Sequence, residues 1–475
     1  MVSKSKKIVA LILTAMMAAS ALAGCASGSS GTTTTPSTPA TTSSKTDEGS
    51  QAGGEGSTTE ASKVEAANLD SDEVMAKIKD KMAEEAAATD GTITMTVWCS
   101  SDDKSFEEGL MKEFEEKYAD TRYSFRIKKS PIGEDKAGGK ILEGPKDGAD
   151  VFSFADDQLA GLVEAGAIAE VANLFNNNVK AENSEKAVEV CTVNGTSYAF
   201  PKTSDNGYFM YYDKTVFTDE DVQSFDAMIA KAKEAGKAVF FEMGNAWYNA
   251  GFFFTAGCTI KYENGVQTAT LNSDEGVAAV KAMCHIAENI GSGFEGDPGS
   301  AGANAFIAQG FKDGKLAAAV TGTWNGPAIK EAIGEENVGA AKLPTILING
   351  EQKQTESFGG YKIVGVNQFS KYQITSQALA YFLTRPESQL KRYEERGLIP
   401  TSNEALANDK VKVDPALKAI NDQKAYAHAQ GKSVSGVFWA SNVGGFGGEI
   451  VAAKGKIDDA ALKKSLKDLD EQINK

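Results

Sequence analysis

The stretch Lys315-Leu-Ala-Ala-Ala-Val-Thr-Gly-Thr-Trp-Asn-Gly-Pro327 combines a strand signal, an aromatic residue and a turn. The apolar run 316–320 is typical of a buried strand. Trp324 falls just past the end of that strand, and Asn325-Gly326-Pro327 predicts a turn into a helix over 328–333. A large aromatic side chain at a strand end is well placed to line a cleft. Taken alone, Trp324 is explained more simply as a rim or core residue.

Strands and helices alternate through the segment 92–154. Apolar and polar residues alternate from 92 to 97 and again from 123 to 127, as in strands, and 150–154 is a further strand candidate. Between the first two, Phe106, Leu110, Phe114 and Tyr118 repeat with helical spacing. This order predicts a parallel α/β sheet with right-handed crossovers. Ligands of such sheets bind beyond the carboxyl ends of the strands, where the turn 100–104 and the segment 154–157 fall.

Composition excludes several classes of function. The chain has 475 residues, of which 41% are hydrophobic, and a net charge of −16. An acidic chain is a poor partner for nucleic acid, whose binding depends on neutralising phosphates. The only histidines are His285 and His428, which excludes a histidine-rich metal site and argues against a histidine-based catalytic triad. We expect no metal and no cofactor.

Cys99, Cys191, Cys258 and Cys284 are widely spaced and form no C-x-x-C pair. The spacing of metal-binding cysteines is therefore absent. We interpret these residues as small buried hydrophobic side chains. The alternative is a disulfide, for which Cys258 with Cys284 is the pair to test.

The first 62 residues have the features of a secretion signal followed by a flexible linker. A basic start and an apolar run over 8–23 end in Leu22-Ala23-Gly24-Cys25, which matches the lipobox of bacterial lipoproteins. We predict a signal peptide over 1–24 and acyl chains on Cys25 that anchor the chain to the membrane; the alternative is a plain signal peptide with a chance cysteine. Residues 25–62 are rich in Ser, Thr and Gly, which predicts a disordered linker. A helix is expected within 63–91, because Ser71 is a good N-cap.

Several motifs together indicate a family. The stretch Phe306-Ile-Ala-Gln-Gly-Phe-Lys-Asp-Gly-Lys315, continued to Trp324, resembles the "A-F-x-x-G-x-A-A-M-x-x-x-G-x-W" signature of the solute-binding proteins of bacterial carbohydrate ABC importers, and most of all their maltose/maltodextrin-binding branch. Further matching motifs stand in the family's order along residues 92–475: Asn194-Gly195-Thr-Ser-Tyr198-Ala-Phe-Pro201, Lys261-Tyr-Glu-Asn-Gly265, the strand 338–344, Gly397-Leu-Ile-Pro400 and Phe438-Trp439.

The resemblance implies a two-lobe periplasmic-binding-protein fold of the α/β class, in which each lobe is a mostly parallel sheet flanked by helices and a hinge crosses several times. Lobe 1 is expected to comprise residues 92–205 and 356–400. Lobe 2 is expected to comprise 206–355 and 401–475.

The resemblance also implies a set of ligand-binding residues. In lobe 1, Asp103-Lys104 resembles the family's hydroxyl-binding "D-K" pair, although Asp102 is possible in place of Asp103. The motif Ala149-Asp-Val-Phe-Ser-Phe-Ala-Asp-Asp157 is similar to "P-D-I-I-F-W-A-H-D", which puts Phe154 at a stacking position and Asp157 at a hydroxyl-binding one. Lobe 2 would contribute Trp324, Trp439 and Trp247, the last on a loop after a strand over 238–243. Asp205 is a further candidate, although a loop acid that binds nothing explains it equally well.

These residue types suit a sugar. A pyranose has apolar C–H faces and polar rim hydroxyls, so its site needs flat aromatic surfaces with charged acceptors and donors at their edges. We therefore expect a binding protein that captures malto-oligosaccharides (α-1,4-glucans) and delivers them to an ABC transporter permease by hinge closure. We expect it to be a lipid-anchored monomer outside the cell membrane. The alternatives are another oligosaccharide, a surface glucan-binding adhesin, or a glycosidase, for which no spacing picks out a pair of carboxylates.

Overall fold

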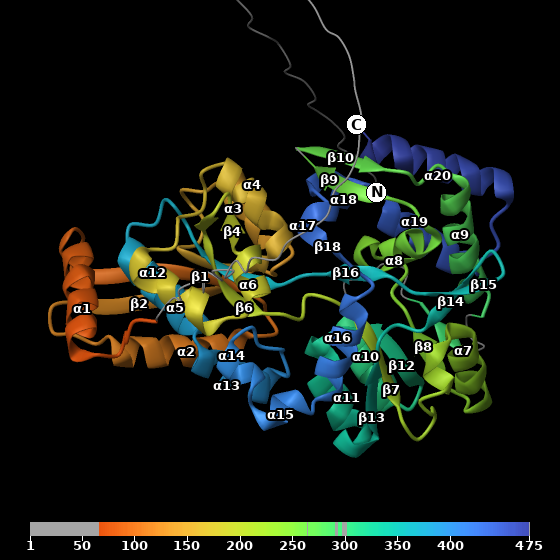
Figure 1. Ribbon diagram of the computed structural model, residues 1–475, viewed down its shortest axis with the longest axis horizontal. Coiled ribbons are helices and arrows are strands. Elements are labelled where there is room, and N and C mark those ends of the chain that lie inside the picture. Colours follow the sequence, from red (N-terminus) through yellow and green to blue (C-terminus); the bar gives the residue numbers. More distant parts are fainter. Residues whose placement is uncertain (1–65, 264, 290–292, 297–301, 475) are drawn as a thin grey trace, which may run out of the picture. The chain divides into compact units, whose positions relative to one another are not determined.

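The computed structural model describes residues 66–263, 265–289, 293–296 and 302–474 (Figure 1). Residues 61–475 belong to one compact unit. The predicted signal peptide, Cys25 and the linker 25–62 lie outside the described residues. Within the described part, two five-stranded sheets form the centres of two bodies, which we call lobe 1 and lobe 2.

Lobe 1 is built on a mostly parallel sheet with the strand order β2-β1-β3-β17-β6. The strands β1 (Thr92–Cys99), β2 (Ser124–Pro131) and β3 (Val151–Ala155) run parallel to one another. Strand β17 (Lys362–Val366), which arrives from much later in the chain, is antiparallel to β3 and to β6 (Ala199–Thr203). This arrangement confirms the predicted α/β sheet, and its first three strands lie close to the predicted ranges 92–97, 123–127 and 150–154.

The helix α12 (Gln373–Thr384) fills the core of lobe 1, because its apolar residues pack with those of β1 and α2 (Lys104–Lys117). The other helices of this lobe are α3 (Ala137–Glu143), α4 (Leu159–Glu164), α5 (Asn173–Glu182), α6 (Glu185–Val190) and α13 (Pro386–Arg396). The motif that starts at Asn194-Gly195 forms a hairpin turn, which joins β4 (Thr192–Val193) to β5 (Thr196–Ser197).

The expected N-terminal helix exists as α1 (Asp72–Ala87), with Ser71 as its N-cap. It is part of lobe 1, because Ile78, Met82 and Ala86 are buried in that core. Its Glu85 carboxylate accepts the backbone N–H of Ile374 at 2.7 Å and so caps the start of α12. Figure 1 shows α1 at the outer edge of the lobe-1 sheet.

Lobe 2 is built on a sheet with the strand order β11-β8-β12-β7-β13. The strands β11 (Phe294–Glu295), β8 (Ala238–Phe240) and β12 (Leu316–Thr321) run parallel. Strand β7 (Phe209–Asp213) is antiparallel to β12 and to β13 (Val338–Ala341). The apolar run 316–320 is thus the central strand of this sheet, and all residues of β12 are buried.

Helices and hairpins surround this second sheet. They are α7 (Phe225–Glu234), α8 (Ala246–Ala256), α9 (Asp274–Ala287), α10 (Ala303–Lys312), α11 (Gly326–Ile333), α16 (Pro415–Lys424), α18 (Gly436–Ala440), α19 (Val443–Ala452), α20 (Asp459–Ile473), β9 (Ile260–Glu263), β10 (Val266–Ala269), β14 (Thr345–Ile348) and β15 (Glu351–Gln354). The last helix of the described residues is α20, whose Leu462, Leu466, Leu469 and Ile473 are buried.

Within the described residues the chain passes between the lobes three times. The first crossing joins β6 to β7 over residues 204–208. The second runs through β16 (Ser357–Gly359), which pairs with β18 (Ala427–Ala429), and enters β17. The third follows α13 and leads through α14 (Asn403–Leu406) and α15 (Asp409–Lys412) to α16. Short segments of this kind can act as a hinge.

The state of the cysteines and the presence of membrane-spanning helices can both be read from the structure. Cys99, Cys191, Cys258 and Cys284 are all buried and free, so the disulfide alternative for Cys258 and Cys284 is wrong. In the part of the chain that the structure describes, no helix has both the length and the apolar character needed to span a bilayer.

Candidate functional site

An aromatic surface on lobe 2 is formed by Trp247 and Trp324. Their ring centroids lie 5.9 Å apart with 38° between the planes. Trp324 lies on a short 3-10 turn directly after β12, as the sequence predicted for a strand end. The predicted loop around Trp247 is instead the first turn of α8, because the Asn245 side chain accepts the backbone N–H of Trp247 at 3.0 Å and caps the helix.

Polar contacts fix both of these indole rings. Trp324 donates its indole N–H to Asn304 on α10 at 3.1 Å. Tyr208 meets the Trp247 ring edge-on with the centroids 4.8 Å apart, and its hydroxyl donates to the Trp247 carbonyl at 3.0 Å. Neither tryptophan is fully buried. The pair is therefore a pre-positioned, partly accessible stacking surface.

Trp439 extends the aromatic groups from another part of the chain. It lies on α18 and packs against Phe358 of the second crossing, with the ring centroids 5.9 Å apart. Its side chain is 36% exposed, so most of the ring is supported while one part meets solvent. Its side chain also faces the carboxylate of Asp157 from lobe 1 and favours the ionised form of that group.

Asp157 is the lobe-1 carboxylate that the structure brings to these aromatic residues. It lies on the short 3-10 turn η1 (Asp156–Gln158) that follows β3. Burial raises its pKa to about 6, although bonds from Gln430 and Trp439 favour the ionised form. Its Oδ1 atom is buried and has no hydrogen-bond partner among the described residues. The oxygen is thus an acceptor that a ligand hydroxyl could satisfy.

Lys362, at the start of β17 in lobe 1, also meets the aromatic surface. Its Nζ lies 5.0 Å from the centroid of the Trp324 ring, which is a cation–π distance. Sequence reasoning missed both Lys362 and Gln430. A single lysine in a strand and a glutamine in a polar segment have no pattern that distinguishes them from ordinary surface residues.

The structure corrects the role of Asp103, which is 4% exposed. Its carboxylate pairs with Lys202 at 3.3 Å and with Arg396 at 3.2 Å. Burial opposes ionisation of Asp103, but Lys202 and the neighbouring cations outweigh it and hold its pKa well below the usual range. Both of its oxygens are occupied within lobe 1, so neither is free to accept a sugar hydroxyl in this structure. Asp102 is exposed and keeps that role open, while the side chain of Lys104 lies outside the described part of the structure.

The network around Lys202 is a buried ion cluster. Besides Asp103, the Lys202 ammonium pairs with Glu107 at 3.2 Å and with Glu134 at 3.3 Å, and Arg392 pairs with Glu107 at 3.1 Å. Burial disfavours the charge of Lys202, yet the three carboxylates raise its pKa above the usual range. The cluster fixes the start of α2 to the end of β6.

Two further predicted site residues are buried elsewhere. Phe154 is 0% exposed and packs in the core of lobe 1 with its centroid 5.0 Å from that of Phe152, so its ring offers no stacking face in this structure. Phe154 lies on β3 and belongs to a cluster of buried residues that includes Leu159 and Leu162 of α4. Asp205 is also 0% exposed, and its Oδ2 accepts the hydroxyl of Thr323 and the backbone N–H of Ile399. Asp205 therefore links the first crossing to the third by a hydrogen bond and does not face a ligand.

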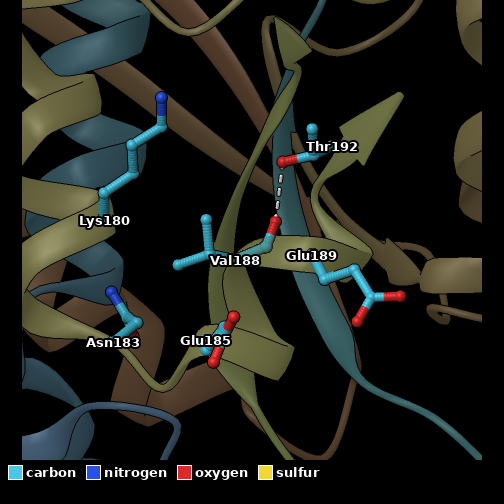
Figure 2. Close-up of a pocket in the computed structure, with 6 residues that line it drawn as sticks. All are labelled: Lys180, Asn183, Glu185, Val188, Glu189 and Thr192. Carbon is cyan, nitrogen blue, oxygen red and sulfur yellow. Dashed lines mark hydrogen bonds between the residues drawn. The ribbon is translucent and has the colours of Figure 1, made fainter. Parts of the chain in front are cut away.

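Two hollows in the described part of the structure are not lined by the tryptophans themselves. One, of about 450 Å³, lies on lobe 1 between α5 and α6 and is lined by polar side chains such as Lys180 and Glu185 (Figure 2). The other, of about 470 Å³, is bounded by lobe 1, the first two crossings and α16. Asp156 lines it, and burial raises the pKa of that carboxyl to about 7. Over the described residues, no group of three or more His, Cys, Asp or Glu side chains is arranged so that it could hold a metal ion.

These features define a class of protein. Two α/β lobes are joined by crossings, and aromatic residues of one lobe meet a carboxylate and an ammonium group of the other. This is the architecture of two-lobe binding proteins, which hold a solute between their lobes.

Comparison with known proteins agrees with this class and gives the family. Residues 109–419 match the family model of bacterial extracellular solute-binding proteins, and the chain belongs to this family. The family consists of binding proteins, so the chain is a solute-binding protein and the glycosidase alternative is set aside.

Three related proteins are informative. A maltooligosaccharide ABC transporter solute-binding lipoprotein of Streptococcus pneumoniae is 28% identical over 69% of this chain and 77% of its own length. A galactooligosaccharide-binding protein of Bacillus subtilis is 27% identical over 60% of this chain and 68% of its own length. A solved structure with acarbose is 32% identical, covers 81% of this chain and 99% of its own, and has a TM-score of 0.70.

Proposed function

We propose that this solute-binding protein captures malto-oligosaccharides between its lobes and delivers them to the permease of an ABC transporter. The observation that carries the proposal is that tryptophans of lobe 2 meet charged groups of lobe 1. Trp324, which lies beside Trp247, meets the Lys362 ammonium, and Trp439 faces the Asp157 carboxylate. The maltooligosaccharide specificity of the pneumococcal relative and the acarbose in the related structure support the choice of ligand.

The geometry suits a linear glucan for a physical reason. Rings fixed at their edges offer flat surfaces at little entropic cost, and successive sugar units can pack on successive rings. Charge-assisted bonds from sugar hydroxyls to Asp157 add direction. Because the rings and the carboxylate belong to different lobes, a sugar makes its full set of contacts only when the lobes are close. Binding then stabilises the closed form, which the permease reads.

The remaining assignments follow from the same proposal. Acyl chains on Cys25 hold the mature protein at the outer face of the cell membrane, and residues 25–62 are its linker. Lobe 1 comprises 92–205 and 356–400, lobe 2 comprises 206–355 and 401–475, and the protein acts as a monomer. The lipoprotein character of the pneumococcal relative supports the anchor.

A different oligosaccharide is the second candidate ligand. Phe154 is buried, so at that position lobe 1 offers no aromatic surface. The likeness to a galactooligosaccharide-binding protein points in the same direction. A galacto-oligosaccharide would use the same tryptophans with a different pattern of hydroxyl contacts.

Calorimetric titration tests the proposal directly. Residues 26–475, without the lipid, are titrated with maltotriose, maltotetraose and a galacto-oligosaccharide of matched length. One-to-one binding of the maltodextrins, tighter than that of the galacto-oligosaccharide, is expected. Absence of heat with every maltodextrin would refute the ligand assignment, and preference for the galacto-oligosaccharide would establish the second candidate. Uptake of maltotriose by cells that carry the Cys25→Ala chain should fall, which separates transport from simple surface adhesion.

A further inference from the structure

Gln430 occupies a junction between the two lobes. It is 6% exposed and begins the short helix α17 (Gln430–Ser433). Its Oε1 accepts the indole N–H of Trp247 at 3.0 Å, and the Asn206 amide lies within 3.4 Å of the same oxygen. Its side chain also faces the carboxylate of Asp157, whose pKa it lowers as a hydrogen-bond donor. One amide thus joins a stacking ring of lobe 2, the first crossing and the carboxylate of lobe 1.

The chemistry of an amide explains why this junction needs glutamine. An acceptor oxygen must face two N–H groups, and a donor NH₂ must face a carboxylate. Glutamate would offer two acceptors and no donor when ionised. Methionine has similar length but would leave the Trp247 N–H and the Asp157 carboxylate without partners in a buried place.

The close packing beneath the junction supports the same conclusion. A Cβ atom on Gly431, the next residue, would lie 3.2 Å from the Cα of Asp157, so the backbone of α17 lies directly against the turn η1. The contact between these two backbones therefore holds the Gln430 side chain close to Asp157.

We propose that Gln430 is a positioning residue of the solute site, which sets the orientation of the Trp247 ring and of the Asp157 carboxylate together so that a sugar can contact both. This inference rests on the proposed function, from which it takes the malto-oligosaccharide as the ligand. Gln430 acts through these two residues, and its loss should change how the site binds without removing a stacking surface.

The surroundings of Asp157 predict that the affinity for sugar depends on pH. Asp156 on the same turn and Asp135 on the segment before α3 are the other carboxyl groups near it, while α17 and α18 face it with the neutral side chains of Gln430 and Trp439. Burial raises the pKa of Asp157 to about 6, and the bond from Gln430 counteracts that rise. In the native protein, affinity for maltotriose should therefore weaken as pH falls from 7.5 to 5 and Asp157 takes up a proton.

Two substitutions separate the two bonds of Gln430. Gln430→Glu keeps an acceptor for Trp247 but loses the donor to Asp157 and adds a like charge. We expect at least a tenfold loss of maltotriose affinity at pH 7.5, with a smaller deficit relative to the native protein at pH 5, where a protonated glutamic acid can donate again. Gln430→Met loses both bonds, so the pH at which affinity falls should move upward. The measurement is titration calorimetry at several pH values.

A ligand-free signature keeps the test independent of the sugar. In ¹⁵N-labelled protein, the indole N–H resonance of Trp247, assigned by its absence in Trp247→Phe, should shift in Gln430→Met and change little in Gln430→Glu. Gln377 is a matched control, since it is a buried glutamine of lobe 1 that bonds to backbone groups at Ala172 and Glu170. Gln377→Glu should alter the melting temperature but neither the indole resonance nor the pH profile of binding.

The outcomes are distinguishable. If the native protein binds no maltodextrin, the proposed ligand is wrong, while the indole resonance still tests the Gln430 junction. If the native protein binds maltotriose and both Gln430 variants bind it equally well with the native pH profile, the positioning role is overturned. An unshifted Trp247 resonance in a folded Gln430→Met protein would overturn it as well.

Discussion

The Oδ2 atom of Asp205 accepts the backbone N–H of Ile399 at 3.0 Å, and this bond ties the first crossing between the lobes to the third. The same oxygen accepts the hydroxyl of Thr323, next to Trp324. A carboxylate that looked from the sequence like a ligand group is therefore part of the hinge. Its second oxygen, Oδ1, has no partner within the described residues.

Asp205→Ala should lower the free energy of unfolding by about 2–4 kcal/mol, because a buried N–H and a buried hydroxyl each lose an acceptor. Urea denaturation measures the change. Asp102→Ala, at an exposed position, is the control and should stay within about 0.5 kcal/mol of the native protein. An Asp205→Ala protein of native stability that has lost its sugar affinity would contradict the hinge role.

Replacing any of Trp247, Trp324 and Trp439 by Ala should weaken maltotriose binding at least tenfold, or about 1.4 kcal/mol. Phenylalanine at the same positions should recover part of the loss, since it keeps a smaller stacking face. Calorimetry on all variants gives the comparison. Phe369→Ala, which removes a 43% exposed aromatic residue on lobe 1, should bind normally. If a tryptophan variant also binds normally, that ring does not contact the sugar.

Phe154→Trp should destabilise the protein by about 1–3 kcal/mol without strengthening sugar binding, because a larger ring is forced into a filled core. Thermal unfolding and titration with maltotriose measure the two effects. A Phe154→Trp protein that gains affinity at no cost in stability would show that this position reaches the ligand.

The pKa of Asp156 is raised by burial to about 7 in the folded protein, from an ordinary value of 3.8. The folded state then holds a proton that the unfolded state has released, so this group makes stability fall as pH rises from about 4 to about 7. Asp156→Asn should flatten that part of the profile and stabilise the protein at pH 8, by at most about 4 kcal/mol. Denaturation at several pH values tests this, and an unchanged slope would count against it.

The four buried thiols should resist alkylation in the native protein. Burial raises the pKa of both Cys258 and Cys284 to about 11, so little thiolate forms at neutral pH. Mass spectrometry of residues 26–475 after iodoacetamide should show no added groups until urea is present, and then four. A mass two units lower, removed by reductant, would indicate a disulfide.

The sequence predicted the framework of this protein well, because its signals are local. The alternation at Ile93, Met95 and Val97 and the apolar run before Trp324 each depend on residues within one element. The contacts at the site join residues far apart in the chain. Trp247 and Gln430 are separated by 183 positions, and no periodic pattern connects them.

The predicted site residues that the structure buries differ from expectation for a related reason, because a local motif does not show the packing around a side chain. Asp103 and Phe154 each match a motif position, but the motif does not say which face of a strand or turn carries the side chain. Phe154 follows Ser153 on β3, where all residues are buried, so alternation of apolar and polar residues gives no face. Lys202 lies in a strand that reads as apolar, and only the fold shows that three carboxylates surround it.

Helix α1 has a mechanical consequence. The chain enters the described structure at lobe 1, where the backbone of Ala67 exchanges two hydrogen bonds with the Asn178 side chain of α5 and α1 is buried in the same core. A pull on the chain before residue 66 is therefore borne by lobe 1 alone. The force is not transmitted through the crossings, so a linker attached before residue 66 does not restrain the movement of lobe 2, whatever the length of that linker.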